Sequence, residues 1–367
     1  MDLTAYRARC AEPLGYLDFA RFGPPTRPVV ERTAELTAAT AVADVSTVDS
    51  LMAWDERARV AVARLCATTA DHVVLLPNTS AGLFHAAFAL RGEVLVSTAE
   101  FPANTYPWTR AEQAGLLRPR WFRPADGRVT PAGITAALTP EITAVSVSAV
   151  DFRTGHVADL AALRAAVGDR LLVVDGIQAF GAVDLPWELA DVLVVGGQKW
   201  LRAGWGTGFA VLSDRALAVQ RPVLSGWTGA DGHDLSDEEV RAPRPTAAGW
   251  SITHLSPVAA AALTEALDLL AGVGVGVVAA AIAERVALLE DVVRAAGATV
   301  HQRPGNRAGI LTWTLPGRSG GEIGEALADA GITVTSRAAH VRLSPHASTR
   351  PEVADRLADT LREIVRT

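Results

Sequence analysis

A single lysine, Lys199, stands in the segment GGQKW (196–200). The chain contains 34 lysine and arginine residues, and all of the others are arginines. The two cations differ chemically, because an arginine stays protonated whereas a desolvated lysine amine can lose its proton and attack a carbonyl carbon. The retention of one lysine in a chain that otherwise uses arginine therefore indicates that Lys199 has a chemical role.

Two polar side chains precede Lys199 near the ends of neighbouring predicted strands. Asp175 closes LLVVD (171–175), Gln178 follows it, and Lys199 lies just beyond DVLVVGG (191–197). Open α/β sheets bind ligands at the carboxyl ends of their strands. This set suits pyridoxal phosphate (PLP): the acid keeps the pyridine nitrogen protonated, the amide donates to the phenolate oxygen, and the lysine holds the aldehyde as a Schiff base and moves the α-proton.

The segment PNTSAGL (77–83) could hold the phosphate of that cofactor, because it joins a predicted strand to a predicted helix. Its backbone N–H groups and the hydroxyls of Thr79 and Ser80 would face an anion at the helix N-terminus. The alternative is an ordinary helix cap. Phe101, just after another strand, could stack on the cofactor ring, although an isolated phenylalanine is more often a core residue.

The elements that must position these residues alternate between short apolar runs and helical patterns. Runs that are apolar at consecutive positions indicate strands buried on both faces, as in a parallel sheet covered by helices. The alternation predicts an α/β doubly wound fold. The predicted strands are 72–76, 93–97, 144–150, 171–175, 191–197 and 208–212, and helices are predicted at 79–91 and 159–168.

The second part of the chain has a different pattern. Residues 225–255 are rich in Gly, Pro and charge, which predicts a loop region between two lobes, and a long helix capped by Ser-Pro is expected over 256–274. We therefore predict a large PLP-binding domain over 17–255 and a small α+β domain over 256–367 that includes 1–16. Its predicted helices are 276–297, 320–330 and 350–366, and its strands are 310–315, 332–336 and 340–344.

Composition narrows the class of protein. The 367 residues are 49% hydrophobic, which is enough for two full cores, and the net charge of −6 argues against nucleic acid as a partner. The polar start predicts no signal peptide, and the most apolar stretch, 273–283, is too short to span a bilayer. Cys10 and Cys66 cannot form a disulfide framework, so we expect a protein of the reducing cytoplasm. We expect neither a membrane partner nor a metal site.

Beyond these features, the chain resembles the class V aminotransferase superfamily, whose members are PLP enzymes of fold type I and include cysteine desulfurases, C–S lyases and isopenicillin N epimerase. The likeness is strongest in VVDGIQAFGAVDL (173–185) and ADVLVVGGQKWLRAGWGTGFAVL (190–212). It continues in the same order through nearly the whole chain, in LDFARFGPP (17–25), EFPANTYPW (100–108), SAVDFRTG (148–155), LSGWTG (224–229) and VRLSPHAS (341–348).

The resemblance implies roles for individual residues. Lys199 would be the Schiff-base lysine, Asp175 the pyridinium partner and Gln178 the neighbour of the phenolate oxygen. Arg342 would bind the substrate α-carboxylate through a bidentate fork, unless it forms a surface ion pair. The resemblance also implies a homodimer with shared active sites. The other implied contacts are phosphate binding by Thr79, Ser80 and Gln198, ring stacking by Phe101, and contact of Thr207 or Trp227 with the partner's phosphate.

This sequence departs from the family pattern at several positions. Gln198 stands where the family often has His, and Gly196 replaces a serine, so the phosphate contacts are the part of the site in question. RAGWG (202–206) replaces a commoner Gly-Pro pattern. Asp151 and Arg153 lie where a substrate or ring contact is usual; they could select a polar substrate or could form a salt-bridged loop.

The reaction stays open within PLP chemistry, because the protein selects among several reactions of the cofactor. The partner would be a small-molecule amino-acid substrate. Cysteine desulfurases need a thiol on the loop before the carboxylate arginine, but residues 331–346 contain no cysteine. A desulfurase is therefore not expected. The overall pattern resembles most the class V lyases that cleave cysteine S-conjugates, and this resemblance implies a C–S lyase that eliminates a thiol from a cysteine S-conjugate. An aminotransferase, or an epimerase- or kynureninase-like enzyme, is the alternative, and a non-catalytic PLP-fold sensor is a remote one.

Overall fold

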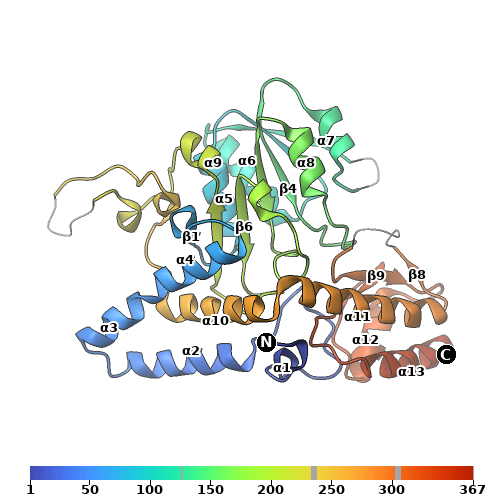
Figure 1. The fold of residues 1–367 in the computed structure, drawn as a ribbon. Helices are drawn as coiled ribbons and strands as arrows, with labels where there is room; N and C mark the ends of the chain where they lie inside the picture. The colour runs from blue at the N-terminus through green and yellow to red at the C-terminus, as the bar shows by residue number, and fades with distance from the viewer. Residues whose placement is uncertain (125–126, 233–237, 302–306, 367) are drawn as a thin grey trace.

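The large sheet has seven strands, and the predicted catalytic residues Asp175 and Lys199 lie at or just beyond the carboxyl ends of two central strands. The structure is a computed structural model that describes residues 1–124, 127–232, 238–301 and 307–366 (Figure 1). The strand order is β1-β7-β6-β5-β4-β2-β3, with β2 to β6 parallel to one another and β7 antiparallel to both of its neighbours. Its strands are β1 (Val73–Leu75), β2 (Glu93–Ser97), β3 (Arg118–Phe122), β4 (Ile142–Ser148), β5 (Leu171–Asp175), β6 (Val192–Gly196) and β7 (Gly208–Leu212).

Both faces of this sheet are buried apart from the edge strand β3, and alternate residues of the other strands belong to different cores. In β5, Leu172 and Val174 face one core, whereas Val173 faces the other. The period of two in side-chain direction makes such a strand apolar at every position. Helices α4 (Trp54–Leu65), α7 (Pro131–Ala137), α8 (Leu160–Val167) and α10 (Pro257–Val273) pack in the first core, and α5 (Thr79–Ala89), α6 (Tyr106–Gln113) and α9 (Asp214–Val219) pack in the second (Figure 1).

The second sheet is small and antiparallel, in the order β10-β11-β9-β8. The N-terminal segment joins it through bridges from Tyr16 to Thr333 and from Asp18 to Ser344. Its strands are β8 (Thr299–Val300), β9 (Leu311–Thr314), β10 (Thr335–Arg337) and β11 (His340–Leu343), and its helices are α11 (Val275–Ala295), α12 (Gly320–Asp329) and α13 (Val353–Arg366).

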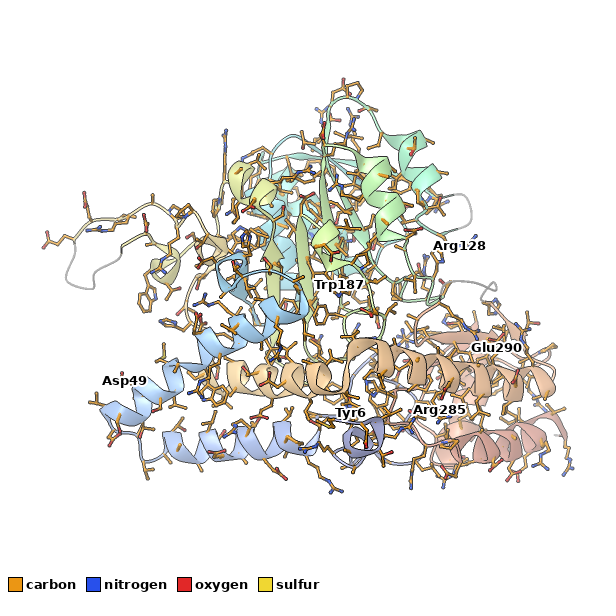
Figure 2. The ribbon with its side chains drawn as sticks, viewed as in Figure 1. Tyr6, Asp49, Arg128, Trp187, Arg285 and Glu290 are labelled. Atoms are coloured by element: carbon orange, nitrogen blue, oxygen red, sulfur yellow. The ribbon has the colours of Figure 1, made fainter. Side chains whose placement is uncertain are left out.

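Long helices form a layer beneath the large sheet and continue under the small one (Figure 1). Helices α2 (Arg27–Thr40) and α4 pack on α10, and α1 (Leu3–Arg7) and α3 (Val45–Met52) also contact it. Figure 2 shows Trp187 among the side chains that fill the interior, whereas Asp49 lies exposed on α3. Among the described residues no single helix is long and apolar enough to cross a membrane. Helices α10 and α11 reach that length and hydropathy only when taken together, and they are bent by 83° where they meet.

The predicted fold class is confirmed, with three local differences. Strand β3 was not predicted because its exposed edge position makes it polar. The orientation of β7 was not predicted from its apolar pattern. Within 225–255, which predicts a loop, the structure has short turns at Trp227–Gly229 and Ala247–Trp250, and the side chain of Trp250 is buried in the second core of the large sheet. The proposed domain boundaries stay a prediction.

Candidate active site

A cavity of about 670 Å³ lies where the carboxyl ends of β5 and β6 meet the small sheet. Because β5 ends at Asp175 and β6 ends at Gly196, the chain turns there and places Asp175 and Lys199 in the cavity wall. Most of the predicted site residues line the same cavity, namely Thr79, Ser80, Phe101, Asp175, Gln178, Gln198, Lys199 and Arg342.

Asp175 and Lys199 form the electrostatic centre of this cavity. Burial raises the pKa of the Asp175 carboxyl to about 6, although the Ile177 N–H at 3.0 Å and the charge of Lys199 act in the opposite direction. Burial lowers the pKa of the Lys199 ammonium to about 8, and the Asp175 carboxylate opposes this shift. A substantial fraction of Lys199 is therefore a neutral amine near pH 8, which is the form that attacks an aldehyde.

Gln178 is held rigidly beside the cavity. Its Oε1 accepts a hydrogen bond of 2.9 Å from Trp200 Nε1, and its Nε2 donates at 2.8 Å to the Ala20 carbonyl. These partners fix the amide orientation, because an indole N–H only donates and a carbonyl only accepts. One N–H of Gln178 is left for the cavity, as donation to a phenolate oxygen would require.

The predicted phosphate cradle has unused donors. The helix cap of α5 is Asn78, whose side chain accepts from Ala81 N–H at 2.9 Å, so neither Thr79 nor Ser80 serves as the cap. The Thr79 hydroxyl is buried without a hydrogen-bond partner among the described residues. Buried polar groups rarely stay unpaired, and a helix N-terminus attracts anions. The donors present therefore fit the phosphate of PLP.

Gly196 closes the floor of this cradle. A Cβ atom at position 196 would lie 2.8 Å from Thr79 Oγ1 and 2.6 Å from Gln198 Oε1. A serine there would crowd both side chains. The departure from the family pattern at Gly196 therefore leaves room for Gln198 beside Thr79, and both side chains line the cavity.

Removal of the Thr79 hydroxyl should weaken cofactor binding. We expect Thr79→Val, which keeps the shape of the side chain, to raise the PLP dissociation constant roughly tenfold to a hundredfold, as for loss of a hydrogen bond to a charged group. The measurement is a fluorescence titration of apo-protein with PLP. Thr33→Val, on the partly exposed surface of α2, is the matched control and should leave the constant unchanged. An unaltered constant in Thr79→Val would remove Thr79 from the cradle.

Phe101 lies across the cavity from the lysine. Lys199 Nζ is 5.9 Å from the centre of its ring, and the ring is 44% exposed. Phe152 packs against it edge to face, since the two ring centres are 5.1 Å apart and the ring planes are nearly perpendicular. The exposed face of Phe101 suits a flat ring bound in front of Lys199.

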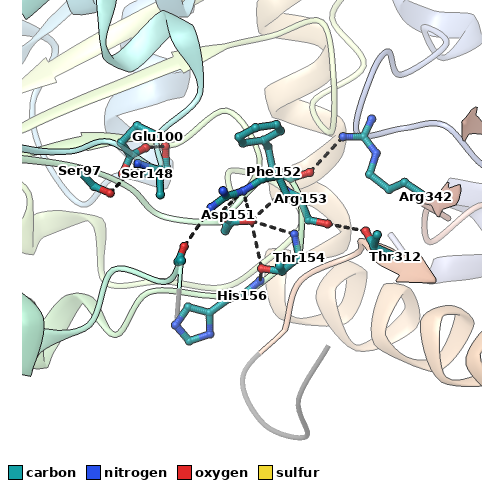
Figure 3. A network of polar contacts seen from close by, with 12 residues as sticks. Ser97, Glu100, Ser148, Asp151, Phe152, Arg153, Thr154, His156, Thr312 and Arg342 are labelled. Carbon is teal, nitrogen blue, oxygen red and sulfur yellow. Dashed lines mark hydrogen bonds and ion pairs between the residues drawn. The ribbon is translucent and has the colours of Figure 1, made fainter. Parts of the chain in front are cut away.

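Arg342 is set on β11 and reaches towards the cavity from the small sheet (Figure 3). It donates to the Phe152 carbonyl and to Thr335 Oγ1, both at 3.1 Å, and pairs with Asp18 at 3.6 Å. Its Nε is buried with no partner among the described residues. This guanidinium therefore keeps a donor for an incoming carboxylate.

The loop after β4 is salt-bridged. Arg153 pairs with Asp151 at 2.6 Å and donates to the Gly127 carbonyl, while Asp151 also accepts from the N–H groups of Arg153 and Thr154 (Figure 3). Of the two predicted possibilities for this pair, the structure shows the internal loop contact. Arg153 still lines the cavity, whereas Asp151 lies outside it.

Sequence reasoning missed a carboxyl group next to the site. Glu100 accepts hydrogen bonds from the N–H, at 3.0 Å, and the hydroxyl of Ser148 (Figure 3), and Ser148 is the β4 partner of Asp175. Burial, together with the Asp175 charge, raises the pKa of Glu100 to about 7. Its position three residues after β2, at the same edge of the sheet as Asp175, was the available signal. Arg21, Trp205, Arg337 and His340 also line the cavity and were missed.

Two predicted residues do not join the cavity. Thr207 is buried, and its hydroxyl donates to the Gly204 carbonyl at 2.8 Å. Trp227 makes an edge-to-face contact with His254. Their predicted contacts involve a second subunit and stay predictions. Among the described residues, no group of His, Cys, Asp and Glu could hold a metal ion.

Comparison with protein families matches residues 16–350 to the family described as Aminotransferase class-V. The chain belongs to this family. The class-V match covers the cavity and both sheets, and it confirms the resemblance read from the motifs. The cofactor indicated for this class-V enzyme is pyridoxal 5′-phosphate, which the donors around Lys199, Asp175 and Thr79 fit.

Individual relatives and structures agree with class-V membership. A probable cysteine desulfurase from Aeropyrum pernix is 30% identical, with 85% of this chain and 84% of that protein covered. A kynureninase from Deinococcus radiodurans is 32% identical over 61% of this chain, which spans 56% of the kynureninase. The solved structure of the cystine C–S lyase C-DES with cysteine persulfide has a TM-score of 0.86 at 18% identity, covering 95% of this chain and 97% of that chain, which shows a shared fold.

Proposed function

We propose that this class-V enzyme cleaves the Cβ–S bond of a cysteine S-conjugate. The α-proton is removed, the Cβ–S bond breaks with its electron pair going to sulfur, and a thiol leaves. The three-carbon remainder takes up water and yields pyruvate and ammonium. Carbon, sulfur and nitrogen are balanced, and no oxidant or acceptor is needed.

The residues of this chain supply positioning and proton transfer. When bound, PLP withdraws electrons from Cα and so acidifies its proton. Arg342 binds the α-carboxylate and thereby sets which Cα bond points towards Lys199. Lys199, whose pKa is lowered by burial, takes the proton from Cα. Phe101 would cover the bound ring and carries no titratable group, so it supplies no competing site for proton transfer.

The observation that carries the proposal is a cavity that holds Lys199 and Arg342 while both cysteines of the chain lie elsewhere. Cys66 is buried in the first core, and Cys10 accepts from Arg202 at 3.0 Å, outside the cavity. Sulfur released at Cβ would therefore leave with the product and would not pass to a protein thiol. The relative named for cysteine desulfuration supports a substrate built on cysteine.

The expected result is release of pyruvate and thiol in equal amounts from S-substituted cysteines, with no keto acid added. The measurement is mass-spectrometric product analysis of purified holoenzyme with a panel of cysteine S-conjugates. Each reaction is repeated with 2-oxoglutarate, which should not change the rate. Matched S-substituted homocysteines, with one more methylene before sulfur, should release no pyruvate.

Other outcomes would identify the alternatives. Turnover that requires the keto acid, with glutamate formed, would reject the lyase and indicate an aminotransferase. Alanine release from kynurenine would indicate a kynureninase-like reaction, and inversion at Cα without bond cleavage would indicate an epimerase. Each of these products differs in mass or chirality from pyruvate.

A further inference from the structure

One wall of the cavity is the hairpin formed by β10 and β11. Thr335 lies opposite Arg342, and Arg337 lies opposite His340. Because side chains alternate in direction along a strand, these four share one face, and all four line the cavity. We call Thr335 and Arg342 the inner pair, and Arg337 and His340 the outer pair.

The other face of the hairpin is packed, so the two pairs cannot turn away. Val341 is fully buried. Ser336 lies against α12, where a Cβ atom on Gly324 would come within 2.4 Å of its hydroxyl. The N–H of Gly320, at the start of α12, donates to the Ala338 carbonyl in the turn of the hairpin at 3.1 Å. The cationic face is therefore fixed towards the cavity.

The inner pair is electrically balanced. Asp18 faces Arg342 at 3.6 Å and accepts from the Thr335 hydroxyl at 2.7 Å. One cation and one anion meet there, and Arg342 Nε has no hydrogen-bond partner among the described residues, which leaves it for the α-carboxylate in the proposed reaction. The proposed function therefore assigns the inner pair to the α-carboxylate.

The outer pair is not balanced. Arg337 is exposed and donates only to the Ser336 carbonyl, at 3.3 Å, and it makes no ion pair with a carboxylate among the described residues. Burial lowers the pKa of His340, and the positive groups of His301, Arg342 and Arg337 lower it further. At neutral pH the charge of the outer pair is therefore that of Arg337, which has no carboxylate within salt-bridge distance among the described residues.

A further cation faces the same space. Arg21 lines the cavity, is exposed, and makes no ion pair among the described residues. Its backbone is held by donation to the Asp18 carbonyl at 3.0 Å, and the preceding Ala20 is bound by Gln178 and by Ser344. Asp175 is the one carboxylate among the described residues of the lining, and it lies at the other end, beside Lys199.

We propose that the outer pair, together with Arg21, binds a second anionic group at the far end of the substrate side chain. The inference rests on the proposed function and narrows it to amino acids whose side chain ends in a carboxylate or a similar anion. Successive residues on one face of a strand are about 7 Å apart, which sets the approximate separation of the two anionic groups. Two fixed cationic positions would select substrates by charge and by length.

The test measures binding of dicarboxylates to the holoenzyme by isothermal titration calorimetry, independently of any reaction. The probes are glutarate, adipate and pimelate, each against its monomethyl ester. We expect at least one diacid to bind about tenfold or more tightly than its ester, as for a charge-assisted hydrogen bond. Arg337→Gln should remove most of that difference and leave ester binding unchanged, and His340→Gln should remove part of it.

Controls separate this role from a general structural one. Arg342→Gln should weaken the diacid and the ester alike, and Arg118→Gln, on exposed β3 away from the cavity, should change neither. Equal affinities for diacid and ester, or no measurable diacid binding, would overturn the proposal. A diacid preference without pyruvate release would reject the lyase reaction and retain the second anion site. Pyruvate release without a diacid preference would retain the lyase reaction and reject the second anion site.

Discussion

Lys199→Ala is expected to lower turnover by roughly 10³-fold or more, because it removes both the covalent anchor of the cofactor and the group that moves the α-proton. The purified variant should also lose the yellow colour that borohydride bleaches. Activity and absorbance are measured on enzyme reconstituted with PLP. The thermal unfolding of the apo-protein should be little changed, which shows that the loss is chemical.

The rarity of lysine makes the control unusually clean. Because Lys199 is the one lysine of the chain, borohydride reduction followed by peptide mass spectrometry should place the cofactor on the peptide that contains it. In the structure the amine of Met1 donates to the Gly272 carbonyl at 2.7 Å, and a label there would be found on a different peptide. Lys199→Arg keeps the charge beside Asp175 and should be as inactive as the alanine variant. Bleachable colour in either variant, or label on Met1 alone, would contradict the assignment.

The second large effect is expected at Arg202, three residues after Lys199 in the same segment between β6 and β7. Arg202 is fully buried, donates to Glu12 at 2.5 Å and to the Pro24 carbonyl at 2.7 Å, and bonds Ser348 at 2.9 Å. Arg202→Met would leave the Glu12 carboxylate buried and unpaired. Such losses cost about 3–5 kcal/mol of the free energy of unfolding. Urea unfolding of the apo-protein, followed by circular dichroism and tryptophan fluorescence, measures the change.

The double variant Arg202→Met with Glu12→Gln tests whether the lost stability comes from the unpaired charge of Glu12. It removes the charge that the single variant leaves unpaired, so it should recover part of the lost stability. Arg64→Met is the matched control, because Arg64 forms an exposed pair with Asp268 and such pairs contribute little. A change below about 1 kcal/mol in the single variant would mean that Arg202 is not a structural anchor.

The strand ends that place the cofactor residues could be predicted from the sequence. A buried parallel strand is apolar at every position, and so the polar residue that ends it is conspicuous. The strand 171–175 ends at Asp175 as predicted, and the strand before Lys199 ends at Gly196, one residue before the predicted end. The strand followed by a helix start at Thr79 was visible for the same reason, whereas its role in binding a phosphate stays a prediction.

Features that depend on pairing between distant segments could not be predicted in this way. Which face of the hairpin carries Arg337 and His340 follows from the register of β10 and β11, not from their composition. Glu100 and Ser148 meet because β2 and β4 are neighbours in the sheet. The reversed direction of β7 had a missed signal, since the connection from Gly196 to Gly208 is too short for the helical crossover of a parallel pair.

The network around Arg202 also constrains the order in which the molecule can be completed. Arg202 lies 190 residues after Glu12 and 146 residues before Ser348, so it joins three segments that leave the ribosome at very different times. Contacts of such long sequence separation form late, because the intervening chain must first be closed into loops. The large sheet, including the strand that leads to Lys199, is synthesised before residue 348 is available. The segment around Lys199 therefore gains this support only after residue 348 has been synthesised, which makes the contacts behind the cofactor site a late product of folding, not its nucleus.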